Sequence, residues 1–148
     1  IKTIDVSKLV TDIPLRERIV NSNDQHASVK VNRAVANEIL KQIKDQDQHR
    51  LYALTNWSAQ TFPWALSQFE FLHWFEGIVV SGHEKTRKPF PEFYQILFDR
   101  YKVNPKTALF IDDSQRNIDG AQALGLPGVH FKSPAQLKSD LLKLGILR

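Results

Sequence analysis

The sequence predicts an α/β protein in which helices cover both faces of a mostly parallel sheet. From about Arg33 onward, short apolar segments with strand character alternate with longer segments of helical period, the signature of βα units. The 148 residues are 42% hydrophobic and 24% charged, which is typical of an ordinary globular domain with a continuous core. We therefore expect a three-layer α/β/α core domain over residues 33–148.

A helix, a strand and a second helix are expected first in this core. An apolar stripe predicts a helix over residues 33–43, and the polar stretch 44–49 ends it. Residues 50–54 are short and apolar, as a buried strand requires. Ser58 then follows as the expected N-cap of an aromatic-rich helix.

Three further strands are expected over residues 77–81, 107–111 and 128–131. Each is a short apolar or β-branched run bounded by turn residues. A loop over residues 82–89 should follow the first of these runs. The repeated alternation with helices predicts that these strands lie parallel in one sheet.

The helices between these strands carry recognisable start and stop signals. Pro91 suits the first turn of one helix, and Gly125 suits the end of the helix that follows the strand at 107–111. Residues 133–136 read Ser-Pro-Ala-Gln, which has the form of a capping box with proline at the first helical position. A final helix should therefore begin there.

Residues 1–32 do not fit this alternation. They mix polar, charged and isolated apolar residues without a sustained period, which predicts a loop, an edge piece or the remnant of a helical cap. The chain begins with Ile1 and contains no methionine, so we expect a fragment or a processed form.

Composition excludes several kinds of chemistry. The absence of cysteine excludes disulfides, thiolate catalysis and cysteine-ligated zinc. No apolar run approaches the roughly 18 residues that span a bilayer, so we expect no membrane partner and, by default, a cytoplasmic location. The net charge of +4 comes from 20 basic residues scattered among 16 acids, which predicts no nucleic-acid partner.

Polar residues follow three of the expected strands: Thr55-Asn56, Lys88 and Asp112-Asp113. Ligands of open parallel sheets bind outside the carboxyl ends of the strands, where these residues should meet. Carboxylates bind hard cations, whereas a hydroxyl, an amide and an ammonium hold anionic oxygens. The set therefore predicts a site for a phosphate ester and Mg²⁺, although it contains no activated serine, cysteine or histidine nucleophile.

Three segments carry a resemblance to a known family. Residues 54–56 (Leu-Thr-Asn), 88–93 (Lys-Pro-Phe-Pro-Glu-Phe) and 110–121 (beginning Phe-Ile-Asp-Asp-Ser) resemble the second, third and fourth motifs of haloacid dehalogenase superfamily hydrolases. Their order and spacing also fit, and three ordered motifs are more specific than one. The resemblance implies a Rossmannoid core of the phosphatase-like branch.

The resemblance also implies roles for individual residues. It implies that Thr55, with Asn56 nearby, binds the phosphoryl group, and that Lys88 neutralises charge on the nucleophile and on the transferring group. The acidic pair would hold Mg²⁺, with Asp113 as the preferred direct ligand. Two further residues, Ser114 and Asn117, would support the acidic loop.

The first motif of that family is not recognisable. The family takes its aspartate nucleophile from an N-terminal strand, in a motif with two aspartates separated by one residue. The nearby candidate here is Asp5 in Ile4-Asp5-Val6-Ser7, where serine replaces the second acid. We therefore expect the N-terminal strand and the nucleophile to be missing from this chain, and the chain by itself to be inactive.

Each motif also has a simpler interpretation. Thr55-Asn56 alone would suit a turn, Lys88 alone would suit a solvated loop, and adjacent acids at a helix N-terminus favour the helix dipole without any metal. Their common position at strand ends favours a site. The five histidines show no metal-ligand spacing, so we assign none of them to catalysis.

Three functions remain open from the sequence. The leading one is Mg²⁺-dependent hydrolysis of a small phosphomonoester through an aspartyl-phosphate. The second is a 2-haloacid dehalogenase acting on a halogenated acid, although the two carboxylates would repel its substrate carboxylate. The third is an inactive relative that serves as a binding module. The sequence indicates neither the substrate nor the oligomeric state.

Overall fold

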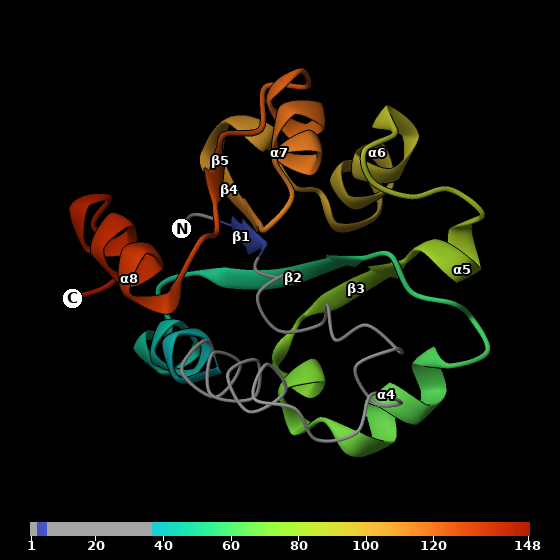
Figure 1. Ribbon diagram of the computed structural model, residues 1–148, viewed down its shortest axis with the longest axis horizontal. Coiled ribbons are helices and arrows are strands. Elements are labelled where there is room, and N and C mark those ends of the chain that lie inside the picture. The colour runs from blue at the N-terminus through green and yellow to red at the C-terminus, as the bar shows by residue number, and fades with distance from the viewer. Residues whose placement is uncertain (1–2, 6–36) are drawn as a thin grey trace.

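The core is a five-stranded parallel sheet with the strand order β3-β2-β1-β4-β5 (Figure 1). The computed structural model describes residues 3–5 and 37–148. Each pair of neighbouring strands in this part of the chain is parallel. The strands are β1 (Thr3–Asp5), β2 (Arg50–Thr55), β3 (Gly77–Val80), β4 (Ala108–Asp112) and β5 (Gly128–His130).

The short strand β1 lies at the centre of the sheet, between β2 and β4. Ile4 is in register with Leu51 on one side and with Leu109 on the other. The prediction that the N-terminal strand is missing, or that this piece lies at an edge, is therefore wrong. Three residues are too few to show a period in the sequence, and their place is decided by pairing with strands more than 45 positions away.

The rest of the N-terminal piece, residues 1–2 and 6–36, lies outside the described residues. The suggested cap remnant falls within it. A division of the chain at residue 32 therefore stays a prediction, although residues 3–5 pair with the strands of the core.

Helices cover both faces of the sheet, so the three-layer α/β/α prediction is confirmed (Figure 1). One face carries α6 (Pro91–Tyr101) and α7 (Gln115–Gln122). The other carries the helix over residues 37–46, α4 (Phe62–Gln68), the 3-10 helix η1 (Glu70–Trp74) and α8 (Pro134–Lys143). The short helix α5 (Ser81–Glu84) follows β3 directly. The 3-10 helix η2 (Pro105–Thr107) directly precedes β4.

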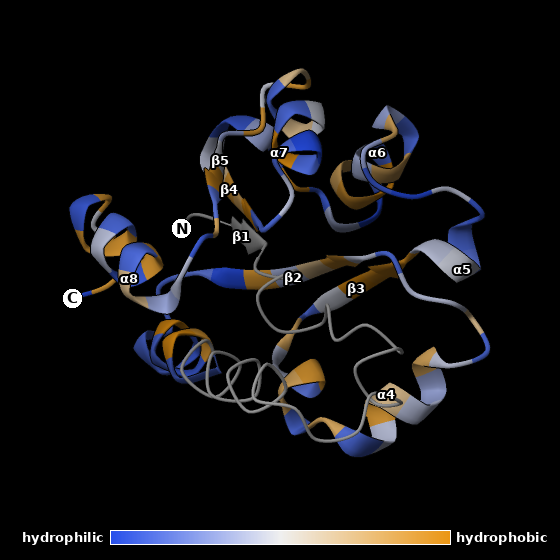
Figure 2. Ribbon diagram, viewed as in Figure 1, coloured by the Kyte–Doolittle hydropathy of each residue, from blue (hydrophilic) through white to orange (hydrophobic). Residues whose placement is uncertain are grey.

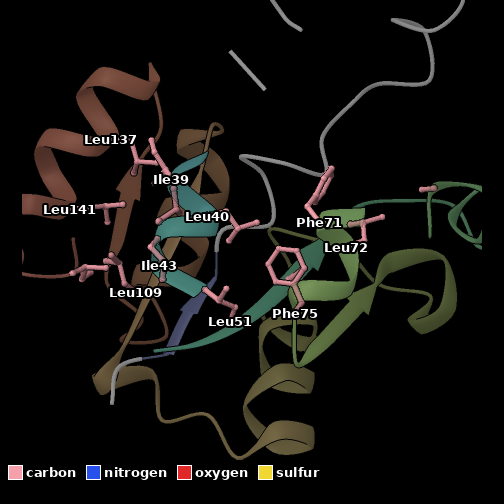
Figure 3. Close-up of a cluster of buried hydrophobic side chains, with 14 of the residues drawn as sticks. Ile39, Leu40, Ile43, Leu51, Phe71, Leu72, Phe75, Leu109, Leu137 and Leu141 are labelled. Carbon is pink, nitrogen blue, oxygen red and sulfur yellow. The ribbon is translucent and has the colours of Figure 1, made fainter. Parts of the chain in front are cut away.

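Each face of the sheet has its own apolar core. Hydrophobic and hydrophilic residues alternate along the described helices, as the ribbon colouring in Figure 2 shows. Leu40 and Ile43 of the helix over residues 37–46 pack with Leu137 and Leu141 of α8 on one face (Figure 3). On the other face, α6 and α7 bury a second cluster that includes Phe110 of β4. The sheet is thereby held between two dry layers, and its strand ends are held in fixed positions.

The predicted helix boundaries are largely confirmed. Ser133 caps α8 in a capping box with Gln136, and Pro91 opens α6. The Ser58 prediction is wrong, because the N-cap of α4 is Thr61, three residues later. Ser58 instead accepts a hydrogen bond from the Thr61 backbone N–H at 3.2 Å, which closes a turn before the helix begins. The expected loop after β3 begins with the single helical turn α5.

Candidate active site

The predicted site residues meet at the carboxyl edge of the sheet. Thr55 is the last residue of β2 and Asp112 the last of β4, and both side chains are buried. Lys88 comes from the segment between α5 and α6, and it is only 2% exposed despite its charge. Most lysines are solvated, so this burial excludes the simpler interpretation of Lys88 as a surface loop residue.

Lys88 and Asp112 form an ion pair that is closed to solvent. Lys88 Nζ lies 2.9 Å from Asp112 Oδ2, and both side chains are 0% exposed. The ammonium also lies 5.6 Å from the centre of the Phe110 ring. Because taking two charges out of water costs several kcal/mol per ion, such a pair is weak evidence for stability. Its position at a strand-end site is better explained by function.

The Asp112 carboxylate also accepts hydrogen bonds from residues at the start of α7. The backbone N–H of Ser114 donates to Oδ1 at 2.8 Å, and Asn117 Nδ2 lies 3.3 Å from both oxygens. Asn117 is itself held by α6, because Tyr94 donates its hydroxyl to the Asn117 carbonyl oxygen at 2.7 Å. Ser114 and Asn117 thus both bond the Asp112 carboxylate, and their supporting role in a working site stays a prediction.

Asn56 holds the backbone of Lys88. Its side-chain oxygen accepts from the Lys88 N–H at 3.0 Å, and its amide nitrogen donates to the Lys88 carbonyl at 3.2 Å. These two bonds join the end of β2 to the segment after α5, which are 32 residues apart in the chain. Asn56 therefore holds the backbone of Lys88 in place, and its predicted contact with substrate stays a prediction.

Asp113 differs from its buried neighbour because it is exposed. Its carbonyl oxygen lies 2.9 Å from Nε2 of His130, at the end of β5. A carbonyl can only accept, so Nε2 must carry the proton. His130 thus supports the acidic loop from the neighbouring strand. The sequence reasoning assigned no histidine to the site, although the position of His130 at a strand's carboxyl end was an available signal.

The two acids fit a magnesium ion that takes its other ligands from substrate and water. Mg²⁺ is usually held by one or two carboxylates together with phosphate oxygens and waters, rather than by a full protein cage. Among the described residues, no group of three or more His, Cys, Asp or Glu could hold a metal ion. Asp113 is the solvent-exposed acid of the pair, and the buried Asp112 accepts hydrogen bonds from Lys88, Ser114 and Asn117.

Asp5, the nucleophile candidate, is the last residue of the central strand, but it does not extend as far toward the carboxyl edge of the sheet as Asp112. Its Cα is in register with Tyr52 and Phe110, whereas the site begins at Thr55 and Asp112. At about 3.3 Å per strand residue, Asp5 is roughly 7 Å short of the level of Asp112. The position level with Asp112 falls two residues after Asp5, outside the described residues.

These features define a Rossmannoid α/β core with buried and exposed charged side chains gathered at the carboxyl edge of its sheet. The family model of haloacid dehalogenase-like hydrolases matches residues 1–130, and the chain belongs to this family. The predicted resemblance is thereby confirmed.

Two curated relatives illustrate the similarity. The chain is 32% identical to sesquiterpene phosphatase astK of Aspergillus oryzae over 110 residues, which cover 72% of this chain and 54% of that protein. It is 36% identical to flavin mononucleotide hydrolase 1 of Arabidopsis thaliana over 76 residues, covering 51% and 30%. The chain thus spans about half the length of the first relative and less of the second.

Solved structures share the fold. An uncharacterized protein from Corynebacterium glutamicum matches with a TM-score of 0.60 at 17% identity, covering 99% of this chain and 94% of that one. A haloacid dehalogenase family enzyme of Bacteroides thetaiotaomicron, in complex with magnesium and inorganic phosphate, matches with a TM-score of 0.58 at 24% identity, covering 76% and 63%. Among the described residues, no helix is long and apolar enough to cross a membrane.

Proposed function

We propose that this site serves the Mg²⁺-dependent hydrolysis of small phosphate monoesters through an aspartyl-phosphate. The observation that carries the proposal is the buried Lys88–Asp112 pair beside the exposed Asp113, at the edge where β2 ends in Thr55. Similarity to a sesquiterpene phosphatase and to the fructose-1-phosphate phosphatase YqaB of Escherichia coli supports a phosphate ester as substrate. A cytoplasmic location stays a prediction.

Each residue of the site would have its own role in this reaction. The Lys88 ammonium, fixed by Asp112 and aimed by Asn56, offsets negative charge on the phosphoryl oxygens. Thr55 binds a phosphoryl oxygen through its hydroxyl. Magnesium, held by Asp113 with Asp112 behind it, would supply further charge neutralisation when bound.

The reaction needs a carboxylate nucleophile. An aspartate oxygen attacks phosphorus as the bond from phosphorus to the leaving oxygen breaks, and the leaving group takes up a proton. Water then attacks the same phosphorus, which breaks the aspartyl–phosphate bond and releases inorganic phosphate. The sequence prediction places this aspartate outside the chain. Asp5, the last residue of β1, is the alternative source.

Turnover of a generic aryl phosphate, with Mg²⁺ and with a chelator, tests the proposal. We expect any turnover to require Mg²⁺. Asp113→Asn should lower the apparent affinity for Mg²⁺ at least tenfold while leaving the melting temperature unchanged, since Asp113 is exposed. Asp119→Asn, which changes an exposed acid of α7, is the matched control. Equal activity in chelator would contradict the magnesium requirement.

Asp5→Asn then locates the nucleophile. If Asp5 attacks phosphorus, the variant should lose turnover by several orders of magnitude and still bind inorganic phosphate, because Lys88 and Thr55 are intact. Unchanged turnover in Asp5→Asn would place the nucleophile elsewhere.

The second candidate function is a phosphate-binding module without catalysis. The register of β1 favours it, because the Cα of Asp5 lies about 7 Å behind the level of Asp112 along the strands. Phosphate and Mg²⁺ binding without turnover, in wild type and Asp5→Asn alike, is the result this candidate expects. The dehalogenase alternative has weaker support, because the acidic pair would repel a carboxylate substrate.

A further inference from the structure

A pocket of about 490 Å³ opens beyond the carboxyl ends of β2 and β3, beside the candidate active site. Its size lies within the range of small-molecule sites, roughly 300–1,000 Å³. It is joined to the active site by Asn56, which lines the pocket and bonds the backbone of Lys88. A ligand in this pocket would therefore lie next to a phosphoryl group at Lys88.

The floor of the pocket is built from two closely packed segments. The carbonyl oxygen of Trp57 accepts both the Gly82 N–H at 2.9 Å and the Ser81 hydroxyl at 3.0 Å. A Cβ at Gly82 would lie 2.2 Å from the Ala59 nitrogen, so no larger residue fits there without a shift. The pocket is thus preformed by backbone contacts.

Two cations line the pocket, and no acid of the described residues does. Lys85 and Arg87 are both exposed and both belong to the lining. Arg87 and Lys88 are adjacent in sequence but differ in burial, because Lys88 turns inward to Asp112 while Arg87 stays at the surface. Such a lining attracts an anionic group on the ligand.

Aromatic side chains form the apolar part of the pocket. Phe90 is 44% exposed, one of the few large apolar side chains at the described surface. The Arg87 guanidinium carbon lies 5.9 Å from its ring centre, and the Phe90 N–H donates to the Arg87 carbonyl at 2.9 Å, so the two side chains project from one turn. Trp57 lines the pocket as well, with its indole N–H already bonded to Thr61 Oγ1 at 2.8 Å.

We propose that this pocket binds the leaving group of the substrate, and that this group carries a flat apolar ring and a second anionic group. Phe90, which is 44% exposed, contacts the ring, whereas Trp57, only 8% exposed, supports the pocket wall from the core. Arg87 with Lys85 binds the anion. The inference rests on the proposed function, because it assumes that the phosphoryl end lies at Lys88.

Ligand binding can be tested without turnover. Phenylphosphonate and 4-carboxyphenylphosphonate are not hydrolysed and differ by one carboxylate, so calorimetry with both measures the contribution of the second anion. We expect the carboxylated ligand to bind wild type about three- to tenfold more tightly, as charge-assisted bonds allow. Arg87→Met and Lys85→Met should each reduce this preference. Lys106→Met, an equal charge change at the opposite edge of the sheet, should leave it intact.

Phe90→Ala should weaken both phosphonates about equally, whereas Phe90→Leu should retain much of the affinity. A preference for the carboxylated ligand that is the same in wild type, Arg87→Met and Lys85→Met would overturn the inference, as would failure of either phosphonate to bind wild type. Failure of the proposed function looks different: aryl phosphate is not turned over, while the preference for the second anion still depends on Arg87.

Discussion

At the scale of single residues, burial separates side chains that the sequence presents as equals. Arg87 and Lys88 are neighbouring cations, and Asp112 and Asp113 are neighbouring acids, yet one member of each pair is buried and the other exposed. The buried members bind each other. The exposed members, Arg87 and Asp113, face solvent. This division lets one short edge of the sheet hold a fixed charge pair and two accessible charges of opposite sign.

The buried pair makes a stability prediction. Lys88→Met should lower the free energy of unfolding by about 3–5 kcal/mol, because it leaves the Asp112 carboxylate buried without its cation. Asp112→Asn alone should also destabilise, since Lys88 then lacks its counter-ion. Urea unfolding of both single variants and the double variant measures their coupling.

We expect the double variant to be more stable than the sum of the two single losses implies, because no unpaired charge remains. Lys106→Met serves as the exposed control and should change stability by less than about 0.5 kcal/mol. Strict additivity of the two changes at Lys88 and Asp112 would contradict the ion pair.

At the scale of elements, the segment from α5 to α6 carries Lys88 and the two cations of the pocket, Lys85 and Arg87. Hydrogen bonds hold this segment at several points. Asn56 holds its middle, and Trp57 accepts bonds from its start. Arg100 of α6 donates to Glu84 of α5 at 2.6 Å, which fastens the two helices to each other. The position of the site's cations thus depends on contacts between elements rather than on any one helix.

The Glu84–Arg100 contact predicts a pH dependence. The hydrogen bond from Arg100 lowers the pKa of Glu84 below its ordinary value of 4.5. A folded-state pKa below the unfolded one contributes stability above about pH 4.5, and this contribution is lost as the pH falls through the folded value. Because Arg100 is 45% exposed, the contribution should be less than about 1 kcal/mol.

Arg100→Met should therefore be less stable than wild type near pH 7, and the two should converge as the pH falls below 4.5. Thermal unfolding at several pH values between 3 and 7 measures the difference. Glu84→Gln should behave in the same way. A constant gap between wild type and Arg100→Met across this range would argue against the assigned pKa shift.

At the scale of the whole molecule, three residues complete the sheet. Strand β1 pairs with β2 on one side and with β4 on the other, so it joins a half that contains β3 to a half that contains β5. Without it, β2 and β4 would each present an unpaired edge in the middle of the fold. We therefore expect β1 to be required for the fold, although the sequence pattern did not place it.

Deletion of residues 1–5 tests this arrangement. We expect the shortened chain to lose cooperative unfolding and to aggregate, because two inner strand edges are exposed. Deletion of residues 1–2 alone, which leaves Thr3–Asp5 in place, should retain the fold. Circular dichroism and size-exclusion chromatography distinguish the outcomes. A folded, monomeric chain that lacks residues 1–5 would show that β1 is dispensable.

The sequence by itself determined the strands β2 to β5, the layered fold and the identity of the chemical groups at the edge, because apolar period and turn residues are local signals. It could not place β1, whose three residues carry no period, and it distinguished Lys88 from Arg87 only through a motif, without showing that Lys88 is buried. Those features, like the support of Asp113 by His130, depend on pairing and burial between distant segments. Only tertiary structure brings such segments together, because water is excluded, and a charge is buried or exposed, only after the layers have packed.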